Sequence, residues 1–321
     1  MSAPPTDSGS DTARRTGIGY CLLAYSLWGL FPIYFKLLSA RPLEILAHRV
    51  LWSALFLALV MRVMRDFQWL AQAFRSRAVW LPHVVSAALL AFNWYVYIWA
   101  VDRGRVVDAS LGYFITPLVS VLIGVAWMAE ALRPGQWLAV GTAVAGVVWL
   151  TWQLGQLPWI GLLLAVSFGS YGAMRKSGRL GALEGLMFEA LLMLPLAGLY
   201  LAWLATHGES QFMAGPSAQR ELLMLAGPLT SVPLLLFAAG ARRIPLSLLG
   251  VLQYVSPTLQ LLLGLWLWHE PFGRSKLIGY ALIWLALAVY TGEGVRDWRG
   301  RVAASSTSRT RRTSVSGKSG F

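Results

Sequence analysis

Three ionisable residues stand close together near the start of an apolar stretch of the chain: Glu44, His48 and Arg49. Glu44 and His48 are four residues apart, so they would share one face of a helix. His48 could change charge near neutral pH, Arg49 could bind an anionic substrate group, and Glu44 could take part in proton coupling. The structural alternative is an ion pair at the outer end of a membrane span.

A further carboxylate, Glu189, has apolar neighbours on both sides along the sequence. A carboxyl group in such surroundings takes up a proton more readily than one in water. Glu189 could therefore carry a coupling proton across a membrane. The alternative is a protonated or paired Glu189 that holds two helices together.

Uncharged polar residues recur at helical spacing in several apolar stretches, and two of these stretches also contain a central proline. Pro117 and Pro257 would each remove a backbone hydrogen bond, and freed carbonyl groups at that depth are tolerated where they line a cavity. Interhelical hydrogen bonds are the alternative role for the polar residues. We expect the following residues to line a substrate pathway: Asn93, Tyr97, Tyr113, Thr116, Gln253, Tyr254 and Ser256.

The elements that must position these residues are apolar stretches long enough to cross a bilayer. Hydrophobic residues make up 57% of the 321-residue chain and charged residues only 13%, against about 25% in soluble domains. A helix needs roughly 20 apolar residues to cross the hydrocarbon core. Ten such spans are predicted, at residues 16–37, 43–64, 79–101, 106–128, 136–153, 157–175, 183–204, 221–241, 246–268 and 276–294.

The positions of Lys and Arg predict the orientation of the spans. Counted on alternate sides, these residues are more numerous on the side of the N-terminus, which predicts that both termini are cytoplasmic. Residues 1–15 and 295–321 are polar, and we expect both ends to be disordered. The bilayer, here a cytoplasmic (inner) membrane, is thus an expected partner.

An internal repeat divides the chain into two halves. A shift of 140 residues superposes unusual positions, and because each half would hold five spans, an odd number, the second half must be inverted. The sequence predicts an all-α membrane protein of ten transmembrane helices, with one five-helix repeat at 16–153 and the other at 157–294. The superposed pairs are Lys36 and Lys176, Glu44 and Glu184, Arg103 and Arg243, Pro117 and Pro257, Gly124 and Gly264, and Glu130 and Glu270.

Several other kinds of function find little support in the sequence. One cysteine and four scattered histidines do not give the usual zinc spacings, so no metal site is expected. Gly317, Lys318 and Ser319 lack the glycine that a phosphate-binding loop would place at Arg312. The basic residues flank apolar spans instead of forming a stripe, which argues against nucleic-acid binding. We expect no cofactor and no enzymatic activity.

Several short segments resemble a known group of permeases. They are Trp28-Gly29 with Pro32 through Lys36, Glu44 through Ser53, Asn93-Trp94, Ser110 through Leu118, Tyr171-Gly172 with Arg175-Lys176, and Leu252 through Thr258. Through these segments the chain resembles the drug/metabolite transporter superfamily, its EamA-type members and, within them, the RarD family. The family's pattern has Asn where Thr116 stands. The resemblance implies an inner-membrane permease connected with chloramphenicol sensitivity, in a superfamily whose members export amino acids and other small metabolites.

Together these features predict a secondary active transporter of small metabolites or drugs that works by alternating access. Its substrate could be an amino acid or chloramphenicol, and a homodimer is an open alternative to a monomer. Two other classes of function stay open: a membrane enzyme that uses His48 and Glu189 as acid and base, and a membrane sensor.

Overall fold

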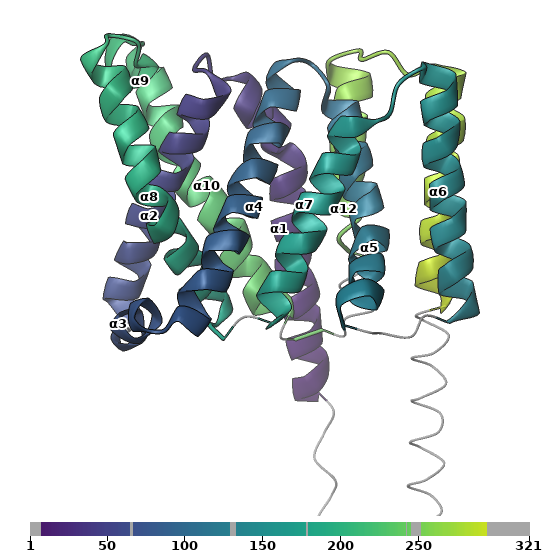
Figure 1. The fold of residues 1–321 in the computed structure, drawn as a ribbon, viewed down its shortest axis with the longest axis horizontal. Coiled ribbons are helices and arrows are strands. Elements are labelled where there is room, and N and C mark those ends of the chain that lie inside the picture. The colour runs from purple at the N-terminus through teal and green to yellow at the C-terminus, as the bar shows by residue number, and fades with distance from the viewer. Residues whose placement is uncertain are drawn as a thin grey trace, which may run out of the picture.

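The computed structural model describes residues 8–64, 67–128, 133–177, 179–241, 243–244 and 252–293. Within these ranges the regular secondary structure is helical, without strands, as the sequence predicts. Figure 1 shows long helices side by side, with α9 at one end of the bundle. The short helix α3 and the N-terminal end of α1 lie at the opposite end.

Helices of the first half cover residues that the sequence assigned to the first repeat. They are α1 (Ser8–Lys36), α2 (Pro42–Met64), α3 (Gln68–Arg75), α4 (Arg77–Asp102), α5 (Val106–Met128) and α6 (Pro134–Leu154).

The second half contains a comparable series and one irregular turn. Its helices are α7 (Trp159–Ser177), α8 (Ala182–Thr206), α9 (Gln211–Ala214), α10 (Ser217–Ala241), α12 (Val255–Leu262) with the π-helical turn η1 (Leu263–Leu267), and the unlabelled helix Arg274–Glu293. This last helix is the yellow one beside α6 in Figure 1.

Six helices in the described part of the chain are long and apolar enough to cross a membrane. They comprise Thr12–Lys36 within α1, α2, α4, Leu183–Thr206 within α8, Ser217–Phe237 within α10, and Arg274–Glu293. Shorter apolar helices lie at Val106–Ser120, Trp159–Met174 and Val255–Leu267. The chain thus has several membrane-crossing helices, while ten crossings and an inverted second half stay predictions.

Some boundaries differ from those predicted. The helix α1 begins at Ser8, so residues 8–15 are helical instead of disordered. Extending an existing helix costs little, because each added residue forms a further hydrogen bond. The short helices α3 and α9 were not predicted, since neither is long enough for an apolar period. The predicted disordered tail at 295–321 lies outside the described residues.

The two halves pack mainly against each other. Helix α1 packs on α10 and α12, α2 on α8 and α10, α4 on α7 and α8, and α5 on α7 and α12. The helices of each half therefore bury their inner faces against helices of the other half, so residues far apart in sequence meet along the centre of the bundle.

Glycines set the closest of these approaches. A Cβ atom at Gly227 of α10 would lie 2.3 Å from the backbone oxygen of Trp52 in α2, and one at Gly29 of α1 would lie 2.8 Å from the Cβ of Leu259 in α12. No side chain fits at such distances, so glycine allows these backbones to come together. The contact at Gly227 holds α2 against α10 one turn from the residues described next.

Candidate functional site

The Arg49 guanidinium lies in the interior of the bundle, between helices of both halves. Arg49 is 5% exposed, and its Nε donates a hydrogen bond to Oγ1 of Thr230 in α10, at 2.8 Å. Its Cζ lies 4.0 Å from the ring centroid of Trp94 in α4 and 5.5 and 5.8 Å from those of Phe31 and Phe35 in α1. We call these five residues the Arg49 chamber. It is a buried positive charge walled by aromatic rings.

A polar cluster from α4, α5 and α7 lies beside the chamber. The amide nitrogen of Asn93 donates to the backbone oxygen of Leu164 and to Oγ of Ser167, at 3.1 and 2.9 Å. The Asn93 oxygen accepts a long bond of 3.5 Å from the hydroxyl of Tyr113. The ring of Tyr97 packs edge-on against that of Tyr113, with 5.6 Å between the centroids. Asn93, Tyr97 and Tyr113, all predicted pathway residues, are thus brought together.

Glu44 and His48 lie on a different face of α2 from Arg49. Oε1 of Glu44 accepts hydrogen bonds from Oγ of Ser210, at 3.2 Å, and from the backbone amide of Phe212, at 3.3 Å. The ring of His48 stacks on that of Phe212, with centroids 4.7 Å apart. Both residues therefore contact the short helix α9, as their shared face predicts, but the predicted pairing of neighbours does not extend to Arg49.

Two polar atoms of this group have no hydrogen-bond partner within the described ranges: Oε2 of Glu44 and Nε2 of His48. The other ring nitrogen of His48, Nδ1, accepts a bond from the indole of Trp52 at 3.2 Å. His48 must therefore carry its proton on Nε2 when it is neutral.

Glu189 is fully buried in α8 and is held by hydroxyl groups from two other helices. Its Oε1 accepts a bond of 2.5 Å from Oγ of Ser86 in α4, and its Oε2 a bond of 3.2 Å from the hydroxyl of Tyr171 in α7. These contacts span both halves. Glu189 shares no printed contact with His48, so the structure gives no support to the two acting as one acid and base pair.

In α5, the predicted helix break does not interrupt the helix. Pro117 lies inside α5, which continues to Met128. The hydroxyl of Thr116 donates to the backbone oxygen of Gly112, at 2.9 Å, so it is turned along its own helix. A predicted pathway residue is thus engaged locally, as threonine often is within a helix.

In α12, the second predicted break falls at the start of the helix. Pro257 lies in the first turn, where a missing amide hydrogen costs nothing, and Gln253 and Tyr254 form the turn before it. Oγ of Ser256 accepts a bond from the amide nitrogen of Gln260, at 3.2 Å. These residues face α1 and stand apart from the Arg49 chamber.

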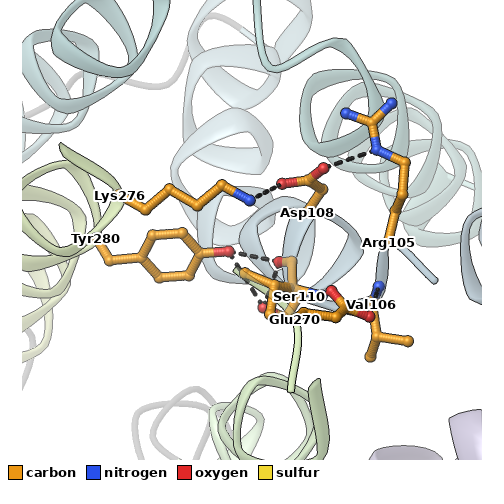
Figure 2. A network of polar contacts seen from close by, with 8 residues as sticks. Arg105, Val106, Asp108, Ser110, Glu270, Lys276 and Tyr280 are labelled. Atoms are coloured by element: carbon orange, nitrogen blue, oxygen red, sulfur yellow. Dashed lines mark hydrogen bonds and ion pairs between the residues drawn. The ribbon is translucent and has the colours of Figure 1, made fainter. Parts of the chain in front are cut away.

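An ion-pair network joins α5 to the helix Arg274–Glu293, as Figure 2 shows. Oδ1 of Asp108 lies 3.1 Å from Nζ of Lys276, and its Oδ2 lies 2.9 Å from Nε of Arg105. The side chains of Asp108 and Lys276 are 23% and 18% exposed. One carboxylate from the first half thus bridges two cations, one from each half.

Glu270 completes this network by capping α5. Its two carboxylate oxygens accept bonds of 2.8 Å each from the backbone amides of Val106 and Val107, the first amides of that helix. Burial raises the pKa of Glu270 above its ordinary value, and the two amides partly offset this change. The sequence analysis paired Glu130 with Glu270; Glu130 lies outside the described residues. We refer to Arg105, Asp108, Glu270, Lys276 and Tyr280 as the Glu270 network.

The loop before Arg274 places Glu270. His269 adopts a left-handed conformation, with φ of 50°, and the amide of Glu270 donates to the backbone oxygen of Gly264, at 2.9 Å. Such a closure ends a helix in a fixed direction. Close by, the hydroxyl of Tyr280 donates to the backbone oxygen of Val107 and approaches Oγ of Ser110 (Figure 2).

A second set of contacts joins the halves at the α9 end. Arg41 forms an ion pair with Glu209, and this hydrogen bond raises the pKa of Arg41. The side chain of Gln219 donates to the backbone oxygen of Leu37, at 2.8 Å, and accepts from the amide of Ser39, at 3.0 Å. The loop after α1 is therefore fastened to residues that flank α9.

Sequence reasoning missed several residues that make these sites. Thr230, Phe31 and Phe35 complete the Arg49 chamber, and Asp108 with Lys276 forms the centre of the Glu270 network. Thr230 and Asp108 are polar residues within or at the edge of apolar stretches, a signal that could have found them. Among the described residues no three His, Cys, Asp or Glu side chains are grouped so that they could hold a metal ion.

Comparison with known proteins adds the family. The sequence model of the EamA-like transporter family matches residues 15–152 and again 158–292. An uncharacterized transporter of Pseudomonas aeruginosa is 43% identical over 286 residues, which cover 89% of this chain and 96% of that protein. The protein RarD of Escherichia coli is 40% identical over 286 residues, covering 89% and 97%.

A solved crystal structure, 21% identical in sequence, shares the fold, with a TM-score of 0.54 over 89% of this chain and 98% of the other. The matched regions take in the Arg49 chamber and the Glu270 network. The chain is a multi-pass membrane protein and belongs to the EamA-like transporter family.

Proposed function

We propose that this chain is a secondary active transporter that exports small metabolites or drugs across the cytoplasmic membrane by alternating access. In this proposal ten helices cross the membrane in two inverted five-helix halves, and both termini are cytoplasmic. Export follows the sequence resemblance to a superfamily of exporters. The family and its named transporters support transport in general.

The observation that carries the proposal is the symmetry of contacts between the halves. Under the 140-residue shift, the packing of α1 on α10 corresponds to that of α7 on α4, and the packing of α1 on α12 to that of α7 on α5. Individual contacts correspond as well. Gly29 meets Leu259, and the shifted pair, Gly169 and Val119, also meets, with a Cβ placed at Gly169 lying 3.3 Å from Cγ1 of Val119.

Paired contacts of this kind are what two inverted copies around a central axis would give, and such an arrangement lets a central site face either side in turn. The Glu270 network and the Arg41 contacts then close the outer side, since both lie at the end opposite the cytoplasmic N-terminus. The buried polar residues between the halves form the proposed pathway: His48, Arg49, Asn93, Tyr97, Tyr113, Thr116, Gln253, Tyr254 and Ser256.

Transport is tested by flux into proteoliposomes. The purified chain is reconstituted, and uptake of labelled chloramphenicol and a panel of labelled amino acids is measured with and without an imposed pH gradient. We expect saturable flux of at least one compound that unlabelled compound on the opposite side accelerates. Equal uptake by liposomes with and without the protein, across the panel, would contradict transport of these substrates.

Proton coupling is tested at Glu189, with Glu184 of the same helix as the matched control. We expect Glu189→Gln to abolish the effect of the pH gradient and to leave exchange at equal pH in place, because an amide cannot release a proton. Glu184, which caps the start of α8, lies near a helix end, and Glu184→Gln should keep the gradient effect. Coupling that survives in Glu189→Gln would rule this role out.

The enzyme alternative receives no specific support. His48 contacts Trp52 and Phe212, whereas Glu189 contacts Ser86 and Tyr171, so the two groups have no common contact through which to act on one substrate.

A further inference from the structure

The guanidinium of Arg49 has far more hydrogen-bonding capacity than the bundle satisfies. Arginine carries five N–H donors. Within the described residues, the single hydrogen bond of Arg49 is the one from Nε to Thr230, and its terminal nitrogens Nη1 and Nη2 find no acceptor. Four donors thus await a partner in the interior of the protein.

The charge of Arg49 also lacks a counter-ion. In the part of the chain that the structure describes, no Asp or Glu lies within 4.0 Å of it. The groups near enough to act on it electrostatically are the phenols of Tyr34, Tyr97 and Tyr113. Neutral phenols do not cancel a charge, so Arg49 differs from a structural arginine that has a buried carboxylate as its partner.

The aromatic walls orient the free donors. The guanidinium lies over Trp94, with Cζ 4.0 Å from the ring centroid, and Phe31 and Phe35 enclose it at 5.5 and 5.8 Å. A guanidinium stacked on a ring keeps its N–H bonds in its own plane, so they remain available to a ligand that approaches edge-on. The rings also exclude water, which strengthens the attraction of any anion that enters.

An independent observation identifies a second ligand group. Tyr97 is 3% exposed, and its hydroxyl has no hydrogen-bond partner within the described ranges. Its neighbour Tyr113 has one long bond, to Asn93. Both hydroxyls belong to the phenols that act on Arg49. A buried hydroxyl without a partner is costly, so a ligand that accepts a bond from Tyr97 would gain from it.

We propose that Arg49, Tyr97 and Tyr113 form a binding site for the carboxylate group of a small organic anion. A carboxylate matches the donor set because its two coplanar oxygens accept two parallel bonds from Nη1 and Nη2 and retain lone pairs for a phenol. The bound anion supplies the missing negative charge. The inference rests on the proposed function in that this anion is the transported substrate, but binding can be measured without transport.

The site is tested with acetate, the smallest stable carboxylate with a methyl group, on the purified full chain in nanodiscs of neutral lipid. Sodium acetate replaces sodium chloride at constant ionic strength, and acetamide serves as the neutral isostere. Tryptophan fluorescence and the midpoint of thermal unfolding are recorded. We expect a saturable change in fluorescence and a higher unfolding midpoint with acetate, and neither with acetamide.

Variants assign the response to these residues. Arg49→Gln should abolish it, and Tyr97→Phe, which removes only one hydroxyl, should weaken acetate binding by about fivefold. Arg103→Gln is the matched control, because Arg103 also lies over a tryptophan, Trp99, at 5.7 Å, but is exposed; it should respond as the wild type does. Tyr97→Phe keeps the test open if Arg49→Gln fails to fold.

Two results would overturn the inference: an acetate response that persists unchanged in Tyr97→Phe and Arg49→Gln, or the absence of any acetate response in the folded wild type. Equal responses to acetate and to a chloride series would overturn the carboxylate assignment. Binding without flux in proteoliposomes would contradict the proposed transport alone, whereas flux without Arg49-dependent binding would contradict this site alone.

Discussion

The Arg49 chamber and the Glu270 network both place charges inside the protein, but they differ in how completely those charges are paired. In the network, Asp108 meets two cations and Glu270 accepts two backbone amides. In the chamber, Arg49 has one hydroxyl partner and no carboxylate among the described residues. The comparison teaches that the network holds helices together, while the chamber is incomplete in the way that a binding site is before its ligand arrives.

The largest difference should appear in transport. For a compound that the proteoliposome assay shows to be carried, we expect Arg49→Gln to lower the initial rate by about 100-fold or more, because one partner of a buried charge contact is removed. Lys276→Gln should lower it by no more than about fivefold, since it weakens a partly exposed pair. Equal losses in the two variants, at equal amounts of folded protein, would erase the distinction between the two regions.

The contact that positions the chamber should have the next largest effect, this time on stability. Gly227→Ala would place a methyl group against the Trp52 carbonyl and force α10 from α2, at a cost of about 1–3 kcal/mol. Thermal unfolding in detergent measures it. Gly198→Ala in α8 is the control, because a Cβ there meets nothing within 4 Å, and it should not destabilise the fold. An unchanged midpoint for Gly227→Ala would contradict the described packing.

Breaking the network should cost less than disturbing the packing. We expect Asp108→Asn to lower the free energy of unfolding by about 0.5–1 kcal/mol, a value kept small because Asp108 and Lys276 are partly exposed. Unfolding is followed at low and high sodium chloride. The wild type should lose stability with salt and Asp108→Asn should lose less, because salt screens the ion pairs that only the wild type has. A salt response identical in both proteins would count against the network.

The smallest expected effect is a pH dependence at Glu270. Because the pKa of Glu270 is raised in the folded chain, the folded state keeps its proton to a higher pH than the unfolded state does. Its stabilising contribution is therefore complete below the ordinary Glu pKa of about 4.3 and is lost as the pH rises through the folded pKa. The stability of the wild type relative to Glu270→Gln should fall over that window. A rise would reverse the assigned shift.

The sequence predicted the helices well because apolar length is a local property. The fourth predicted span, 106–128, has the same limits as α5. Departures occur where length gives no signal: α9 has only four residues, and the extension of α1 to Ser8 is polar. Pro257 was expected in mid-helix, and residues 245–251 before it lie outside the described ranges, so the position of the helix start was not readable from the apolar run.

The site was less predictable, because partners come from the other half. His48 and Arg49 are adjacent and looked like one site, but successive residues of a helix point in directions about 100° apart. His48 therefore contacts Phe212, and Arg49 contacts Thr230. Periodicity shows that two residues share a face, as Glu44 and His48 do, but which helix covers that face depends on tertiary packing.

The central claim, alternating access with the Glu270 network as an outer closure, is tested most directly by distances at the two ends of the bundle. Spin labels are attached to a Cys21→Ala background at Arg103→Cys with Gly273→Cys, at the network end, and at Arg75→Cys with Arg179→Cys, at the α3 end. Electron–electron double resonance is recorded with and without Lys276→Glu, which sets two negative charges against each other. The account predicts that this substitution lengthens the first distance and shortens the second. Two distances that stay unchanged, or that lengthen together, would contradict it.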